Sequence, residues 1–201
     1  MLVALSGYGG SGKDSVADVL VADYGFKRYA WADTLRLAAA ALNPIVSWDG
    51  RVPIRYIDAI EEVGYNVAKF EYPEVRTLLQ RLGTEVGRNL IGDNVWVDAT
   101  LHRIQRECDP WDDVVITDTR FLNEVEVVKN PEASPLRGSA YCVRVNRPAV
   151  GPAGDHPSET DLDDYDFDYT INNDGALEDL PGAVEDFLKA TEISRLELRL
   201  F

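Results

Sequence analysis

Residues 2–13 of the chain read LVALSGYGGSGK, and this stretch decides the fold class. Its first part, Leu2 to Leu5, is an apolar run of the length and composition of a buried strand. From Lys13 to Asp23, apolar residues recur at helical spacing. A strand that runs through a glycine-rich turn straight into a helix is the opening unit of an α/β protein with a parallel sheet.

The turn itself satisfies the pattern G-x-x-x-x-G-K in the context that the pattern requires, after a predicted strand and before a predicted helix. Its glycines let successive backbone N–H groups converge on phosphate oxygens, and the helix N-terminus adds partial positive charge. The residues expected to bind nucleotide phosphates are Gly7, Gly9, Gly10, Ser11, Gly12 and Lys13. A flexible glycine-rich turn is the alternative, but the coincidence of strand, spacing, lysine and helix favours nucleotide binding.

Further apolar runs alternate with helical patterns, which favours a three-layer α/β fold of about five parallel strands with helices on both faces. Strands are expected at 26–30, 114–117, 140–145 and 169–172, and helices at 33–42, 74–82, 95–107 and from 177 onward. Residues 44–75 mix aromatic and charged residues and are assigned loosely to helical excursions outside the sheet. A segment at 146–160, interrupted by proline and glycine, is expected to form a lid-like loop.

The chain has 201 residues, of which 35 are acidic and 20 basic, giving a net charge of −15. Its length and its 45% of apolar residues suffice for a single domain with a real core. An acidic surface repels nucleic-acid phosphates and anionic lipid, so neither nucleic acid nor membrane is expected as a partner. The first basic residue is Lys13 and the longest apolar run is 37–42, which predicts neither a signal peptide nor a membrane span. Two distant cysteines, Cys108 and Cys142, fit a soluble protein in a reducing compartment.

One departure from the pattern concerns the residue after the lysine, where Ser or Thr normally binds magnesium. Here that residue is Asp14, and Ser15 follows it. Three interpretations are open: Asp14 coordinates Mg²⁺ directly or through water, Ser15 supplies the hydroxyl ligand, or the charge of Asp14 favours the helix N-terminus. A role of Asp14 near the metal is favoured.

A second candidate element is the apolar run Val114 to Thr117, which leads directly into Asp118. The carboxyl ends of parallel strands face the ligand crevice of an open α/β sheet. Asp118 is therefore expected to hold Mg²⁺ through water, and Arg120 to meet phosphate. In the alternative interpretation, Asp118 caps a helix that contains residues 123–129.

With these elements in order, the chain resembles the bacteriophage deoxynucleoside monophosphate kinases, a branch of the P-loop kinases, over most of its length outside residues 43–70. The resemblance is carried by LSGYGGSGKDS (5–15), QRLGTE (80–85), VWV (95–97), DTR (118–120), VNRP (145–148), HPSE (156–159) and NDGALEDL (173–180). The pairing of lysine with aspartate after the glycines also occurs in that family. A magnesium-binding loop therefore remains compatible with Asp14.

The resemblance implies transfer of the γ-phosphoryl group of ATP, with Mg²⁺, to the 5′-phosphate of a deoxynucleoside monophosphate. The acceptor oxygens are already ionised at neutral pH, so no general base is needed. Catalysis then comes from alignment, exclusion of water and neutralisation of charge by Mg²⁺, Lys13 and arginines such as Arg120. ATP and the monophosphate are the expected partners, in the cytoplasm or in the host cytoplasm if the chain is phage-encoded, and a homodimer is left open.

The same resemblance places the acceptor in the helical region 33–100. Its expected binding residues are Arg76, Gln80, Thr84, Arg88 and Trp96, with an exposed amphipathic helix and a core tryptophan as the ordinary alternatives. Four-residue spacing keeps the first three on one helix face if Gly83 does not break the helix. P-loop kinases often place acceptor-binding groups after their second strand, a position that singles out Asp33 and Arg36. Arg36 is expected to clamp the 5′-phosphate. The alternative role of Asp33 is a simple N-cap. Arg147 resembles the lid arginine that packs on adenine or touches phosphates.

Other functions stay open at this point. The loop with its Lys-Asp pair also resembles phosphomevalonate kinase, and the turn at 173–175 resembles dephospho-coenzyme A kinase; these enzymes differ in the acceptor pocket. A nucleotide-dependent regulator is less favoured, because the chain has no Asn-Lys-x-Asp motif and no Asp-Glu pair after the strand at 114–117. With just two histidines, His102 and His156, a zinc site has little support.

Overall fold

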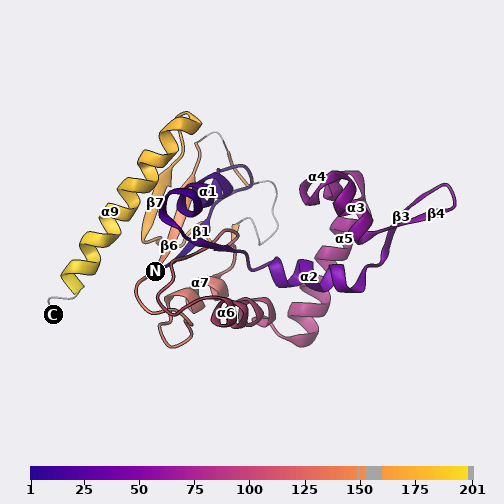
Figure 1. Ribbon diagram of the computed structural model, residues 1–201, viewed down its shortest axis with the longest axis horizontal. Helices are drawn as coiled ribbons and strands as arrows, with labels where there is room; N and C mark the ends of the chain where they lie inside the picture. The colour runs from indigo at the N-terminus through magenta and orange to yellow at the C-terminus, as the bar shows by residue number, and fades with distance from the viewer. Residues whose placement is uncertain (149, 153–159, 199–201) are drawn as a thin grey trace. The chain divides into compact units, whose positions relative to one another are not determined.

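In the computed structural model, residues 1–148, 150–152 and 160–198 are described, and the chain divides into two compact units. Unit 1 comprises Met1–Trp31 and Leu101–Phe201, and unit 2 comprises Ala32–Thr100. The bounds of unit 2 nearly coincide with the helical region 33–100 that the sequence singles out. Figure 1 follows the chain through its elements.

Unit 1 is built on a five-stranded sheet in which every strand pair is parallel, in the order β2-β5-β1-β6-β7. The strands are β1 (Leu2–Ser6), β2 (Lys27–Tyr29), β5 (Val114–Ile116), β6 (Ala140–Asn146) and β7 (Tyr169–Asn172). The helices are α1 (Lys13–Tyr24), α7 (Leu122–Lys129), the 3₁₀-helix η2 (Leu177–Asp179), α9 (Leu180–Leu198) and the end of α6 (Val95–Glu107). All five strands expected from the sequence are present, and the three-layer α/β fold is confirmed.

The side chains of β1 point alternately to the two faces of the sheet and so contact both helical layers. Side chains of successive strand residues point to opposite faces of the sheet. Val3 and Leu5 belong to the core cluster that contains Leu20 of α1 and Phe187 of α9, all of them fully buried. The alternate residues of β1 face the other layer, where α7 packs against β1 and β6. Because both faces are covered by helices, β1 reads as a continuous apolar run rather than an alternating one.

Unit 2 consists of helices and one β-hairpin around a small core of its own. Its elements are α2 (Asp33–Leu42), β3 (Ile45–Asp49), β4 (Val52–Arg55), α3 (Tyr56–Val63), α4 (Tyr65–Glu71), α5 (Pro73–Gln80), the π-helix η1 (Arg81–Ile91) and the start of α6. The core contains the buried residues Ala39, Val46, Tyr56, Val75 and Leu79. Apolar residues of α2, α3 and α5 thus pack on one another and on the base of the hairpin.

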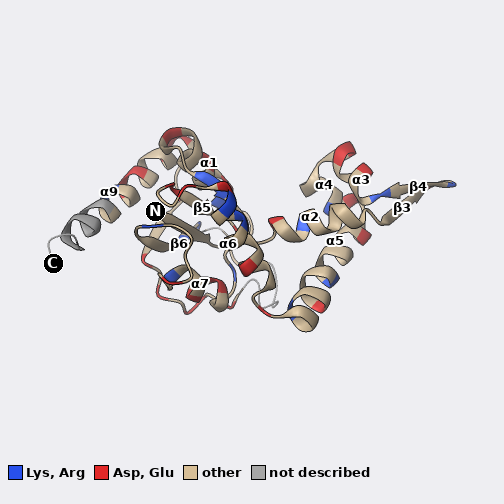
Figure 2. Ribbon diagram, turned by 60° about the horizontal axis from the view of Figure 1, so that its bottom comes forward, with Lys and Arg blue, Asp and Glu red and all other residues tan. Residues whose placement is uncertain are grey.

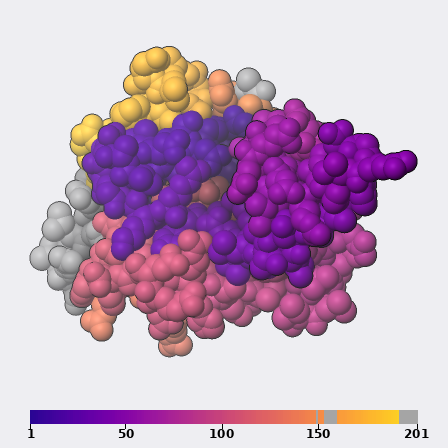
Figure 3. Space-filling view, turned by 45° about the vertical axis from the view of Figure 1, so that its right-hand side comes forward, coloured from indigo at the N-terminus to yellow at the C-terminus, as the bar shows by residue number. Residues whose placement is uncertain are grey.

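The hairpin corrects the assignment of residues 44–75 to helices alone. β3 and β4 pair antiparallel, with Asp49 opposite Val52, across a two-residue turn of Gly50 and Arg51, where Gly50 has a φ of 59°. A two-residue turn that starts with glycine suits a hairpin, whereas Pro53 speaks against a strand because it lacks a backbone donor. The hairpin accommodates Pro53 because it has just two strands, both of which are edges. Its tip protrudes from unit 2 in the space-filling view (Figure 3).

The helix expected at 74–82 continues much further than its pattern indicates. α5 passes at Arg81 into the eleven-residue π-helix η1, which closes with a bond from Gly92 N to Gly87 O of 3.0 Å. Gly83 does not interrupt it. π-helical turns are rare and are frequently found at functional sites.

Acidic residues occur along the helices and loops of both units (Figure 2). Among the described residues, no helix has the length and apolar character needed to cross a membrane.

Candidate active site

The glycine loop lies between β1 and α1, as the sequence predicts. Its last glycine, Gly12, is the N-cap of α1 and has a φ of 98°, in the left-handed region that disfavours other residues. A Cβ at Gly12 would also collide with the side-chain amide of Asn173. The loop is closed by a bond from Ser11 N to Tyr8 O of 3.1 Å. Both conformation and space therefore require glycine at the point where the loop enters the helix.

Asn173 is a loop contact that the sequence analysis did not single out. It follows β7, and its Nδ2 donates to Ser11 O at 2.9 Å. Its own backbone N donates to Asn146 O at 2.7 Å, which fixes it at the carboxyl edge of the sheet. The sequence did offer one signal for Asn173, because it follows the last predicted strand and lies in the segment 173–180 that carries the family resemblance.

Lys13 is folded back over the loop. Its Nζ donates to Gly7 O at 2.7 Å and to Tyr8 O at 2.8 Å, and only 9% of the residue is exposed. Within the same loop, Ser11 Oγ is buried without a hydrogen-bond partner among the described residues. An unsatisfied buried hydroxyl is costly, and a phosphate oxygen is a suitable acceptor for it. The loop therefore fits the phosphate groups of a nucleotide.

The segment that carries Asp118 and Arg120 follows β5, which pairs in parallel with β1. Thr119 N donates to Leu5 O at 3.1 Å, which ties the residues after β5 to the end of β1. The Asp118 carboxylate accepts from Trp31 N at 2.7 Å, so it is anchored at the same edge of the sheet. The backbone after β5 is thus tied to the end of β1, while the roles of Asp118 and Arg120 in binding metal and phosphate stay predictions.

The N-terminus of α7 tests the alternative role of Asp118 as a cap. The N-cap residue is Phe121, and Glu124 Oε2 accepts from Arg120 N at 2.7 Å and from Phe121 N at 3.1 Å. Asp161 Oδ2 accepts from Leu122 N at 2.9 Å. Glu124 is only 3% exposed, so its bonds hold the backbone of Arg120 firmly. These contacts assign the capping of α7 to Glu124 and Asp161.

The magnesium ligands remain a prediction. Asp14 forms an ion pair with Arg28 of β2, and the same guanidinium donates to Asp18 at 2.7 Å. That pair directs the Asp14 carboxylate toward β2, a contact that the sequence did not indicate. Among the described residues, no group of three or more His, Cys, Asp and Glu is arranged to hold a metal. Mg²⁺ typically keeps several waters and uses one or two protein ligands with substrate phosphates, for which the half-buried Ser15 and Asp118 remain candidates.

Tyr8 of the glycine loop is also held by contacts with Asp163 and Arg144, which lie outside the loop. The Tyr8 hydroxyl donates to Asp163 Oδ1 at 2.7 Å, which raises the pKa of the phenol above its usual value. Arg144 of β6 binds the same carboxylate at 3.1 Å and places its Cζ 4.6 Å from the centre of the Tyr8 ring. Arg147 is exposed just after β6, and most of the lid-like segment expected around it, residues 149 and 153–159, lies outside the described residues.

In unit 2, the predicted acceptor residues follow one another along α5 and η1. Arg76, Gln80 and Thr84 are exposed and Arg88 is half-buried. A step of four residues is slightly more than one turn of an α-helix but slightly less than one turn of a π-helix. The rotation between Arg76 and Gln80 on α5 is therefore partly reversed along η1. The four side chains therefore stay close to one face of the continuous helix.

Trp96 supports that helix from the start of α6. Its Nε1 donates to Gly83 O at 2.9 Å, and a Cβ at Gly87 would lie 2.5 Å from the indole nitrogen. The indole thus lies directly against the backbone of η1. This is a packing role, and stacking of Trp96 on a base stays a prediction.

Asp33 and Arg36 lie at the start of α2. Arg36 donates to Asp33 Oδ1 at 3.1 Å, and its Cζ lies 4.6 Å from the centre of the Tyr65 ring. Tyr65 and Lys69, both of α4, were not candidates in the sequence analysis, because they fall in the segment without readable chemistry. Burial raises the pKa of the neighbouring Tyr56.

A parallel sheet with helices on both faces, and a glycine loop with lysine between β1 and α1, define a three-layer P-loop NTPase fold. The family of deoxynucleotide monophosphate kinases matches residues 38–184, most of the chain. The chain therefore belongs to the deoxynucleotide monophosphate kinase family, and its resemblance to the phage enzymes is confirmed.

Individual relatives support this assignment at low identity. The chain is 25% identical over 202 residues to a putative deoxynucleotide monophosphate kinase of Acanthamoeba polyphaga mimivirus, covering 89% of this chain and 91% of the relative. The deoxynucleotide monophosphate kinase of Escherichia phage RB69 is 31% identical over 116 residues, which cover 57% of this chain and 45% of that protein. The kinase of the same name from Enterobacteria phage T4 is 23% identical, covering 94% and 98% of the two chains.

Proposed function

We propose that this chain transfers the γ-phosphoryl group of ATP to the 5′-phosphate of a deoxynucleoside monophosphate, giving the diphosphate and ADP. The observation that carries the proposal is the glycine loop, with Lys13 folded over it and Ser11 Oγ buried inside it, in a chain of the deoxynucleotide monophosphate kinase family. A cytoplasmic site of action, where ATP and deoxynucleotides are present together, accords with this activity.

The reaction requires little covalent chemistry from the protein. In our proposal the loop N–H groups and Lys13 bind the β- and γ-phosphates, and Lys13 moves from the carbonyls of Gly7 and Tyr8 to the developing negative charge. Arg120 adds positive charge at the end of β5. The acceptor phosphate is its own nucleophile, since it is ionised at neutral pH. Alignment and exclusion of water then supply most of the rate.

Magnesium belongs to this proposal as the ion that neutralises charge on the transferring phosphates. Ser15 and Asp118 are the side chains proposed to hold it, directly or through water. Asp14 was favoured for that role in the sequence and joins them only if its ion pair with Arg28 opens. The proposal predicts that activity depends on added Mg²⁺ and is lost with a chelator.

The decisive experiment measures ADP formation from ATP with dGMP, dTMP, dCMP, dAMP and the four ribonucleoside monophosphates as acceptors. Phosphomevalonate and dephospho-coenzyme A serve as comparison acceptors of other P-loop kinases. Turnover restricted to deoxynucleoside monophosphates is the expected result and would also reveal base preference. Turnover with phosphomevalonate or dephospho-coenzyme A alone would replace the proposed acceptor.

A further inference from the structure

Tyr8 carries the one large side chain of the glycine loop. Of the five residues between Gly7 and Lys13, three are glycines, and the Ser11 hydroxyl has no hydrogen-bond partner among the described residues. Glycine loses more conformational freedom on ordering than any other residue. A loop of this composition therefore gains most from an anchor on its remaining side chain, that of Tyr8.

The anchor of Tyr8 is a closed set of three side chains in unit 1. The Tyr8 hydroxyl donates to Asp163 Oδ1 at 2.7 Å, and Arg144 Nη2 donates to the same oxygen at 3.1 Å. The Cζ of Arg144 also lies 4.6 Å from the centre of the Tyr8 ring, within the range of a cation–π interaction, about 6 Å. The Arg144 side chain is only 16% exposed, which limits its freedom. Each of Tyr8, Arg144 and Asp163 thus contacts the other two, and together they form a loop clamp.

The loop clamp bears on the backbone carbonyl of Tyr8, where two bonds of the loop meet. This carbonyl accepts from Ser11 N at 3.1 Å and from Lys13 Nζ at 2.8 Å. The first bond closes the turn of the loop, and the second holds the lysine that the proposed function assigns to the phosphates. A shift of Tyr8 would therefore move both the backbone and the cation that bind phosphate in that proposal.

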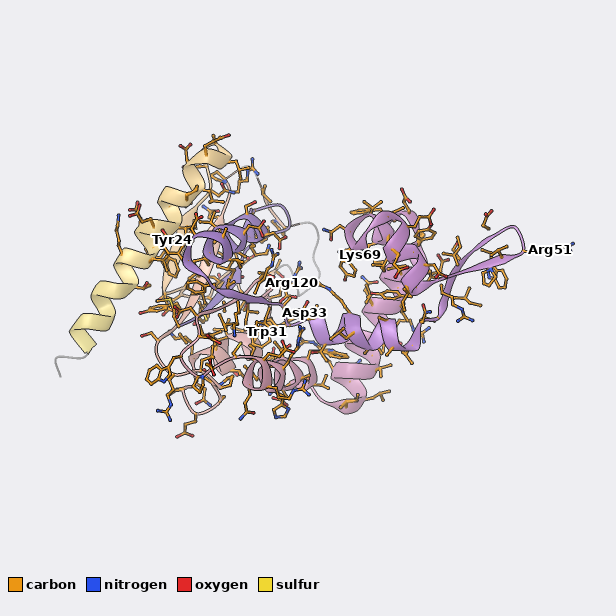
Figure 4. The ribbon with its side chains drawn as sticks, viewed as in Figure 1. Tyr24, Trp31, Asp33, Arg51, Lys69 and Arg120 are labelled. Atoms are coloured by element: carbon orange, nitrogen blue, oxygen red, sulfur yellow. The ribbon has the colours of Figure 1, made fainter. Side chains whose placement is uncertain are left out.

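The clamp residue Asp163 lies in a turn, residues 160–164, that is also tied to a second element of the site. In the same turn, Asp161 Oδ2 accepts from Leu122 N at 2.9 Å. Leu122 lies two residues after Arg120, which is labelled in Figure 4. The turn therefore connects the glycine loop with the segment that carries Arg120.

We propose that the loop clamp positions the glycine loop for the phosphates of ATP, with Tyr8 as a positioning residue and Asp163 as its anchor. Holding a loop in its binding conformation raises affinity, because less conformational entropy is lost when the ligand binds. This inference rests on the proposed function and deepens it, since it explains how a loop rich in glycine is kept ready for the nucleotide.

The first test is Tyr8→Phe in the full chain, which removes the hydroxyl and keeps the ring. We expect the KM of ATP to rise about five-fold, with kcat and the KM of the monophosphate unchanged, because only the readiness of the loop is lost. Tyr24→Phe is the matched control and should keep the original KM, since Tyr24 is the last residue of α1, at the far end of the helix that the loop enters (Figure 4). A purely structural role of Tyr8 would instead lower the Tm and kcat without changing the KM of ATP, and that result would overturn the inference.

A double-mutant cycle tests whether Tyr8 and Asp163 act through one bond. Asp163→Ala should raise the KM of ATP about as much as Tyr8→Phe, and the combined variant should stay within about two-fold of either, whereas independent effects would multiply to about 25-fold. Asp164→Ala removes a carboxylate of the same turn that is not part of the loop clamp, and it should leave the KM of ATP unaltered. Multiplying effects, or equal KM values for Asp163→Ala and Asp164→Ala, would reject the clamp.

Binding of ATP with Mg²⁺, measured by calorimetry without an acceptor, makes the test independent of turnover. If the unaltered chain binds ATP but phosphorylates no deoxynucleoside monophosphate, the proposed function fails, and the ATP affinities still decide the role of the clamp. A Kd raised by Tyr8→Phe but not by Tyr24→Phe would support it, and equal Kd values would reject it. Failure of the unaltered chain to bind ATP would overturn both proposals.

Discussion

The two units of the chain carry two different kinds of candidate phosphate-binding groups. In unit 1, the glycine loop presents backbone N–H groups, one lysine and the buried hydroxyl of Ser11. In unit 2, the candidate groups are side chains, with Asp33 and Arg36 at the start of α2 and four polar residues along α5 and η1. Unit 1 contains 13 basic and 25 acidic residues, a net charge of −12, whereas unit 2 contains 7 and 10, a net charge of −3.

This difference teaches how an acidic protein can bind anions. Backbone N–H groups and a helix N-terminus supply positive potential that does not appear in the residue count. Unit 1 can therefore be strongly acidic and still hold a triphosphate in one small loop. A site made of arginine and lysine side chains depends on each charge separately. Substitutions should accordingly act through backbone geometry in unit 1 and through individual charges in unit 2.

The largest effect is expected for Lys13→Ala, which removes the one side-chain cation of the loop. We expect kcat to fall about 10³-fold, because Lys13 acts on charge that develops in the transition state. Steady-state ADP release measures the change, with circular dichroism as a check on folding. Lys189→Ala, which removes an exposed lysine of α9, should leave kcat unaltered. A Lys13 variant with near-normal turnover would show that the loop has been misassigned.

Gly12→Ala tests whether loop geometry itself carries the function of unit 1. The left-handed conformation costs a non-glycine residue about 1–2 kcal/mol, and the displaced Asn173 would lose its bond to Ser11 O, worth about 1 kcal/mol. Urea unfolding should show a loss of about 2–3 kcal/mol, together with weaker ATP binding. Gly182→Ala in α9 has open space and should instead gain up to about 1 kcal/mol. Equal effects of the two substitutions would contradict the described loop.

Arg88→Ala tests the dependence of unit 2 on single charges. The KM of the monophosphate should rise about ten-fold with little change in kcat, as expected when ground-state binding is lost. Arg81→Ala is the matched control, because Arg81 lies in the same π-helix and pairs with Glu85 at 3.2 Å. If both variants keep the original KM, Arg88 does not belong to the acceptor site.

The smallest effect is expected for Trp96→Phe, which leaves Gly83 O without its indole donor. Loss of that bond should cost about 1 kcal/mol, seen as a Tm lower by about 2–4 °C for a chain of this size. Trp111→Phe, which alters an indole that is 68% exposed, should change the Tm hardly at all. An unchanged Tm for Trp96→Phe would mean that this contact does not support η1.

The same contrast explains what the sequence could predict. The phosphate loop is one continuous stretch with a fixed spacing between a strand and a helix, so its position followed from a local pattern. The strands β1 and β5 followed from their apolar runs, whereas the roles of Asp118 and Arg120 stay predictions. Asn173, which follows β7, binds Ser11 O of the loop, and Arg28 of β2 binds Asp14 and Asp18 of α1; no local pattern encodes such contacts. The contact of Arg36 on α2 with the Tyr65 ring on α4 likewise joins residues far apart in the sequence. The hairpin at 45–55 was missed because its two short strands lie in a stretch that mixes aromatic and charged residues, and β4 carries Pro53, which is rare in strands.

The π-helix η1 also affects which changes the chain can accept during evolution. A π-helical turn accommodates one residue more than an α-helical turn, so the segment behaves like an α-helix with an inserted residue. Deleting a single residue between Arg81 and Arg88 would allow ordinary α-helical winding, and eleven steps of about 100° would leave Arg88 about 20° from the direction of Arg76. Relatives that lack one residue in this stretch should therefore keep Arg76 and Arg88 close to one face on an ordinary α-helix.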